Sequence, residues 1–153
     1  MESIGYREMN AGEEAIVCEL VEKVFKKFVA PDYGKDGVEE FFRFANPSAM
    51  NERLKSDGFV LVAHQVNELV GMIEFFPPDH IAMLFVTIHH KGIAKELLNK
   101  TISKARVLNP NLSKIDVHSS PYAEPIYQKM GFHKTGNTTT ENGITYTPME
   151  LSL

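Results

Sequence analysis

The amino-acid sequence predicts an α/β fold built around one mixed sheet. Helical spacing of apolar residues dominates residues 10–55, three strand-like runs follow between residues 59 and 88, and helical and strand-like patterns alternate after them. A chain of 153 residues has the usual size of one domain. It contains no repeat and no long linker, so we expect residues 1–153 to form a single domain.

The first third of the chain is mainly helical. Asn10 and Glu13 stand three residues apart, as in a capping box that starts a helix, and apolar residues at helical spacing follow. Asn46-Pro47 interrupts a second helical stretch, because a proline cannot donate a helical hydrogen bond. We expect a strand over residues 4–9, a helix that begins near residue 10, and shorter helices over residues 37–45 and 47–55.

The middle of the chain changes to strand character. Residues 59–65 and 69–76 are rich in β-formers and are separated by Asn67-Glu68, which predicts a hairpin. Residues 80–88 form a third run that is apolar on both faces, as expected of a central strand.

Helices and strands alternate in the last third. Apolar residues form one stripe from Gly92 to Leu108, and Asn109-Pro110 ends that helix. Short strands are expected over residues 115–118 and 144–151. Between them, Ser120 is the expected cap of a helix with Pro121 at its first position, and Gly131 and Phe132 are expected to end it in a Schellman motif.

The composition limits where the protein works. No apolar run reaches the roughly 18 residues of a membrane span, and the N-terminus has no basic start or apolar core of a signal peptide. The one cysteine, Cys18, permits no internal disulfide. We therefore expect a cytoplasmic protein without membrane attachment. Because Cys18 lies within a periodic helix, we expect it in the core and not as a nucleophile.

Charge is unevenly distributed along the chain. The formal net charge is −4; residues 1–40 hold ten acids and five bases, whereas residues 89–106 hold five bases and one acid. The basic block is either a solvated helix face or a local anion site. The acidic N-terminal helices favour a cationic amine over a nucleic acid as partner, since nucleic-acid binding needs a basic surface for the phosphates.

The basic block coincides with a strand, loop and helix start. The first turn of a helix leaves N–H groups unpaired, and Gly92 and Ala94 would let a ligand approach them closely. Lys91 and Lys95 add positive charge, so a pyrophosphate would fit. The pattern is neither a Walker A loop nor a GxGxxG fingerprint. The alternative is a glycine that eases helix–sheet packing.

Two stretches of this half of the chain resemble known motifs. His89-His90-Lys91-Gly92-Ile93-Ala94 resembles the Gln/Arg-x-x-Gly-x-Gly/Ala acetyl-CoA motif of the GNAT (Gcn5-related) N-acetyltransferase family. Residues 119–132 resemble the second landmark of that family, Ala-x-x-x-Tyr-x-x-x-Gly-Phe. The resemblance covers residues 59–151 and implies a GNAT-type domain with a mostly antiparallel sheet. It departs at His89, which replaces Gln or Arg, at His90, which replaces a frequent Gly, and in a shorter loop before Gly92.

The resemblance implies acetyl-CoA as co-substrate and a set of residues that bind it. Backbone groups of the strand would hold the pantetheine arm, with the Val86 N–H as donor to the thioester oxygen. The loop and helix start would hold the pyrophosphate, and one residue at the end of the next strand and one just after it would complete the site. The implied cofactor-binding residues are Leu84, Phe85, Val86, His89, His90, Lys91, Gly92, Ile93, Ala94, Lys95, His118 and Ser120.

Acetyl transfer to an amine also needs proton transfers. By resemblance, Tyr127 would protonate the departing thiolate; the alternative is a core tyrosine on an amphipathic helix. Glu74 and His80 are the candidate general bases, because each carries a group that can accept a proton near the end of an inner strand. Either could instead be a satisfied polar residue.

Two other chemistries are not supported by the residue spacing. His89-His90 is an adjacent pair with no further ligand at metal-binding spacing, so we expect no metal site. Asp116, His118, Ser119 and Ser120 include hydrolase residue types, but they lie on one short strand without a Gly-x-Ser-x-Gly elbow.

The sequence therefore favours an N-acetyltransferase that moves acetyl from acetyl-CoA directly to a primary amine of a small molecule or peptide. The alternative is a non-catalytic acyl-CoA-binding regulatory module of the same fold. A third possibility, acetylation of tRNA, conflicts with the net charge of −4. The resemblance also leaves a homodimer possible.

Overall fold

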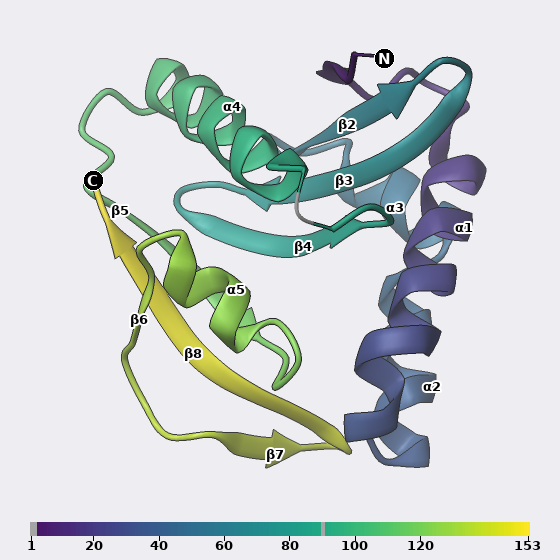
Figure 1. Ribbon diagram of the computed structural model, residues 1–153, viewed down its shortest axis with the longest axis vertical. Helices are drawn as coiled ribbons and strands as arrows, with labels where there is room; N and C mark the ends of the chain where they lie inside the picture. Colours follow the sequence, from purple (N-terminus) through teal and green to yellow (C-terminus); the bar gives the residue numbers. More distant parts are fainter. Residues whose placement is uncertain (1–2, 90) are drawn as a thin grey trace.

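The computed structural model describes residues 3–89 and 91–153, which form one mixed sheet flanked by helices (Figure 1). The strands are β1 Gly5–Glu8, β2 Phe59–Gln65, β3 Glu68–Phe76, β4 His80–Val86, β5 Lys114–Ser119, β6 His133–Lys134, β7 Thr139–Glu141 and β8 Ile144–Ser152. The helices are α1 Glu14–Val24, α2 Lys35–Phe44, α3 Pro47–Arg53, α4 Ile93–Leu108 and α5 Glu124–Lys129. A π-helical turn, η1 Phe25–Val29, and a 3-10 turn, η2 Ala30–Asp32, follow α1.

The sheet has the strand order β1-β2-β3-β4-β5-β8-β6, and β7 pairs with β8 outside that path. All pairs are antiparallel except β4 with β5. The predicted mixed, mostly antiparallel sheet is therefore confirmed, with β4 as its central strand. The two short strands β6 and β7 lack a strand-like sequence pattern and form only because β8 offers them an edge.

Each face of the sheet carries its own hydrophobic cluster. On one face, α4 and α5 pack against side chains such as Ile73 and Ile115. On the other face, α1 and α3 cover Val62 and Met72. Figure 1 shows α4 and α5 on the opposite side of the sheet from α1 and α2. The sheet thus separates two layers of helices. A ligand site that is open to both faces therefore requires a gap between two strands.

The helix after β1 differs from its prediction at both ends. The Glu13 carboxylate accepts the Asn10 backbone N–H at 2.7 Å, which is half of the expected capping box. The Asn10 side chain makes no cap, and the helix begins at Glu14. The same Glu13 carboxylate pairs with Arg7 at 2.8 Å, and this ion pair lowers its pKa to about 2. At the other end, the helical spacing continues through η1, whose wider turn carries the pattern on to Val29.

The end of α5 forms as predicted, but its start does not. Ser120 Oγ accepts the Ala123 N–H at 3.2 Å, yet residues 121–123 form a turn and the helix begins at Glu124. Proline is still in the first helical turn, although it is Pro125 and not Pro121. At the C-terminus, Gly131 has a φ of +102° and the Phe132 N–H donates to the Tyr127 carbonyl at 3.0 Å, which is the expected Schellman motif.

In residues 3–89 and 91–153, no helix combines the length and the apolar character that crossing a membrane requires.

Candidate active site

The site lies where β4 and β5 separate. Their parallel ladder pairs His80 with Asp116 and Ile81 with Val117, and no further pair follows among the described residues, although both strands continue. The Thr87 N–H donates to the Val70 carbonyl of β3 at 2.9 Å. Because successive N–H groups of a strand point to opposite edges, those of Leu84 and Val86 point away from β3 and toward β5. The gap between the strands therefore exposes unpaired backbone donors.

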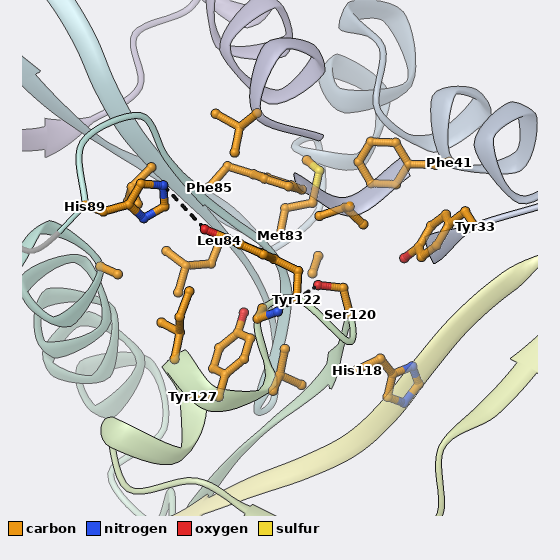
Figure 2. A pocket seen from close by; sticks show the side chains of 18 residues that line it. Tyr33, Phe41, Met83, Leu84, Phe85, His89, His118, Ser120, Tyr122 and Tyr127 are labelled. Carbon is orange, nitrogen blue, oxygen red and sulfur yellow. Dashed lines mark hydrogen bonds between the residues drawn. The ribbon is translucent and has the colours of Figure 1, made fainter. Parts of the chain in front are cut away.

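A cavity lies in this gap and is open toward both faces of the sheet. It encloses about 790 Å³ when the part open to solvent is included. One wall comes from α4 and α5, another from α1, η1 and α2, and the floor from β4 and β5. Figure 2 shows the side chains that converge on it. Eight of the predicted site residues line this one cavity: Leu84, Phe85, Val86, His89, Ala94, His118, Ser120 and Tyr127.

The loop after β4 leads to the N-terminus of α4. Gly92 caps that helix with a φ of +72°, a left-handed conformation that favours glycine. The Glu96 N–H makes the first helical bond, to the Gly92 carbonyl at 3.0 Å, so the three preceding N–H groups have no partner within the helix. The Lys91 and Lys95 side chains are exposed beside them, while the Ile93 side chain is buried in the core. His90, also predicted here, lies outside the described residues.

An aromatic cluster lies at the cavity, with His89 and Tyr122 among the lining residues. The Tyr122 hydroxyl, from the segment before α5, lies 3.4 Å from His89 Nε2, from the loop after β4. Phe28 of η1 stacks on Tyr122 with ring centroids 4.7 Å apart and meets the edge of His89 at 5.1 Å. The motif comparison does not single out Phe28 or Tyr122. Only the turn geometry of η1 and of residues 121–123 brings them together.

Tyr127 lies in the cavity wall with its hydroxyl turned inward (Figure 2). Its side chain is 5% exposed, and burial raises the pKa of the phenol. The Phe132 ring packs against its edge at a centroid distance of 5.1 Å. The Schellman motif places Phe132 there, so the end of α5 fixes the direction in which Tyr127 points.

The structure does not bring Glu74 to the cavity. Its side chain is fully buried on the α1 and α3 side of β3, where Arg53 Nε donates to Oε2 at 2.9 Å and Nη2 to Oε1 at 3.0 Å. The Arg53 guanidinium also lies over the Phe44 ring, 3.6 Å from its centroid. Both carboxylate oxygens are therefore engaged, and Glu74 ties α3 to the sheet.

His80 and His118 form a second polar group beside the cavity. His80 Nδ1 contacts Asp116 Oδ1, and the two imidazole rings lie 5.2 Å apart, edge to face. His118 lines the cavity, stacks on Tyr146 at 4.5 Å and keeps part of its side chain exposed. Desolvation and then the nearby His80 lower the pKa of His118, which favours its neutral imidazole. His80 itself is not among the lining residues.

The comparisons with known proteins agree with this fold. The family model described as "Acetyltransferase (GNAT) domain" matches residues 29–153. A GCN5-related N-acetyltransferase from Rhodopseudomonas palustris superposes with a TM-score of 0.84 at 22% identity, covering 100% of this chain and 98% of that one. The PaiA N-acetyltransferase from Thermoplasma acidophilum, solved in complex with coenzyme A, gives 0.78 at 18%, covering 99% of each chain. A comparison with curated proteins finds no match.

A fold with separating central strands, together with this match to most of the chain, defines the class of protein. The chain belongs to the GNAT acetyltransferase family. The predicted family is thereby confirmed.

Proposed function

We propose that the protein is an acetyl-CoA-dependent N-acetyltransferase that acts on a primary amine. One observation carries the proposal. The cavity passes between β4 and β5 and holds both a buried phenol, Tyr127, and an imidazole with a lowered pKa, His118. The PaiA N-acetyltransferase, which shares the fold, was solved with coenzyme A, and this supports the same co-substrate here.

The described residues fit such a co-substrate. The N–H groups of Leu84 and Val86 face the gap and would bond a pantetheine arm as an added strand does. The free N–H groups at the start of α4, with Lys91 and Lys95 nearby, would hold a pyrophosphate. The space beside Gly92 is open, since a Cβ at this position would meet no atom of the described residues within 4 Å. Acetyl-CoA would supply an acetyl group activated as a thioester.

Tyr127 supplies a proton in this proposal. A phenol whose pKa is raised stays protonated at neutral pH and is therefore available as a donor. Burial also raises the pKa of a thiol in this cavity, so the pKa values of the phenol that donates the proton and of the thiolate that accepts it stay close. The Val86 N–H, which faces the gap, is our candidate donor to the thioester oxygen as negative charge develops there.

His118 is our candidate proton acceptor, in place of Glu74 or His80. The lowered pKa leaves its imidazole neutral, and it stands on the cavity wall with an open side through which a proton can pass to water. The two hydrogen bonds from Arg53 to the Glu74 carboxylate argue against this role for Glu74. His80 stands behind His118 and is a positioning residue held by Asp116.

The test uses the purified chain in two measurements. Acetyl-CoA should raise the melting temperature, and thiol release from acetyl-CoA should increase in the presence of a panel of primary amines, with the acetylated amine identified by mass. A melting temperature unchanged at millimolar acetyl-CoA would rule out the proposal. Cofactor binding without release of thiol for any amine would favour the non-catalytic acyl-CoA-binding module.

A further inference from the structure

We propose that the acceptor is a primary amine on an uncharged, apolar body of aromatic size. This inference rests on the proposed function and names its substrate class. The acceptor would occupy the part of the cavity on the α1, η1 and α2 side of the sheet. The opposite side is the one that carries the α4 N-terminus and Tyr127, and the cofactor is assigned there.

The wall on this side is apolar and partly aromatic. Six residues form it: Val24, Val29, Tyr33, Phe41, Met83 and Phe85. Figure 2 shows Tyr33, Phe41, Met83 and Phe85 on one side of the cavity, opposite Tyr127. Such a wall contacts an apolar body over a wide area and offers ring faces and edges to an aromatic one.

The rings of this wall are held by their own packing. Phe41 stacks on Phe25 at a centroid distance of 3.9 Å, and Tyr33 meets the edge of Phe25 at 5.4 Å. Phe85 approaches Phe41 at 6.0 Å. Phe25 is fully buried and does not line the cavity, so it anchors the two rings from behind. The wall is therefore preformed, and its shape does not depend on the acceptor.

No charged side chain faces an acceptor here. Within the described part of the chain, the residues that line the cavity include no Asp, Glu, Lys or Arg. The acids that make residues 1–40 negative are thus not on this wall. A second ammonium, as in a polyamine, or a carboxylate, as in an amino acid, would lose its water without gaining an ionic partner. An uncharged body loses little when its water is removed.

The phenol of Tyr33 adds one polar contact. Burial, and then the nearby Asp32, raise the pKa of Tyr33 to about 12, so the hydroxyl keeps its proton. It can exchange a hydrogen bond with a hydroxyl or an amide on the acceptor but cannot neutralise an ammonium. The apolar wall has a further effect, because desolvation lowers the pKa of an amine and raises the share of the neutral form that can attack.

The test compares amines with the wild-type chain. We expect kcat/KM for 2-phenylethylamine to exceed that for spermidine and for lysine by about tenfold or more, since a charge buried without a partner loses its hydration and gains no ionic contact. Phenylalanine amide and phenylalanine form a matched pair that differs in one carboxylate, and the amide should be preferred. Equal or higher kcat/KM for spermidine, lysine or phenylalanine would overturn the inference and leave the proposed function standing. Failure of every amine would instead count against the function itself.

A variant pair locates the acceptor. Phe41→Leu removes a ring from the wall and should raise KM for 2-phenylethylamine about three- to tenfold, with little change for ethylamine. Phe42→Leu is the matched control, since Phe42 also packs on Phe25 at 5.3 Å from the same helix but does not line the cavity. If KM for 2-phenylethylamine rose equally in both variants, the rise would reflect a general disturbance of the fold and not the loss of a ring from the wall. The comparison of amines with the wild-type chain decides the inference even if Phe41→Leu does not fold.

Discussion

Tyr122 and His89 lie 3.4 Å apart, hydroxyl to Nε2, in the lining of the cavity between β4 and β5. His89 follows β4, and Tyr122 follows β5 and precedes α5, so the pair links the segments after these two strands where the strands themselves no longer pair. Phe28 packs against both rings from η1. The contact therefore connects three segments that are distant in the sequence.

The first prediction concerns this contact. Tyr122→Phe keeps the ring and its stacking on Phe28 but removes the hydroxyl, so the segments after β4 and β5 lose one hydrogen bond worth about 1 kcal/mol. We expect the Kd for coenzyme A, measured by calorimetry, to rise about fivefold. Tyr6→Phe on β1 is the control, because Tyr6 does not line the cavity. Unchanged or tighter binding by Tyr122→Phe would show that the contact does not help to retain the cofactor.

The second prediction concerns the buried ion pair. Arg53→Ala would leave the Glu74 carboxylate, which is 0% exposed, without its partner, and we expect a loss of about 3–5 kcal/mol in the free energy of unfolding. Urea titration measures this loss. Glu74→Gln in the Arg53→Ala background should recover part of it, because the amide carries no charge. If Arg53→Ala cost less than about 1 kcal/mol, within the range of an exposed pair, the structural role given to Glu74 would be wrong.

The strands and helices could be predicted because their signals are local. The apolar runs predicted at residues 59–65 and 80–88, of which the second ends as a strand at Val86, and the stripe of the helix that ends at Leu108 depend only on spacing along the chain. Gly131 and Phe132 are likewise a local signal, and the Schellman motif formed as expected. The family resemblance rested in addition on two motifs in the expected order, at residues 89–94 and 119–132.

The features of the site that the sequence did not predict depend on contacts between distant segments. Whether Glu74 faces the cavity or Arg53 is decided by how α3 packs on the sheet, and no pattern within residues 68–76 shows it. Phe28 and Tyr122 are ordinary aromatic residues in the sequence, and their meeting with His89 requires η1 and the turn before α5. The apolar acceptor wall was hidden in the same way, because overall charge does not report which side chains line a cavity.

The third prediction tests Tyr127 as the proton donor. Tyr127→Phe keeps the ring that packs on Phe132 and removes the hydroxyl, so we expect kcat to fall about 10²- to 10⁴-fold. The Kd for coenzyme A should change less than about twofold, because the backbone groups assigned to the cofactor are untouched. Tyr6→Phe again serves as the control for the loss of one phenol. A variant with normal kcat would assign Tyr127 to the core and leave the donor to be found elsewhere.

The fourth prediction concerns pH and His118. Because its pKa is lowered from the ordinary value near 6.5, the neutral imidazole predominates at pH 7 and the protonated form gains weight as the pH falls below that ordinary value. As proton acceptor, His118 would make kcat/KM fall on the acid side below pH 6.5. Stability follows the same sign: the unfolded chain binds the proton more readily, so the folded state is favoured above pH 6.5 and loses part of that advantage as the pH falls.

His80→Asn tests the physical cause of that shift. The imidazole of His80 is the second cause that lowers the pKa of His118, after desolvation, and its removal also ends the contact of His80 with Asp116, which keeps its pairing with Lys114 at 3.5 Å. Both changes favour the protonated form of His118, so the acid limb of the kcat/KM profile should move to higher pH. His118→Gln should remove that limb and lower kcat, whereas His64→Gln on β2, away from the cavity, should change neither. An acid limb that stays in place in His80→Asn and survives in His118→Gln would assign the proton acceptor to another group.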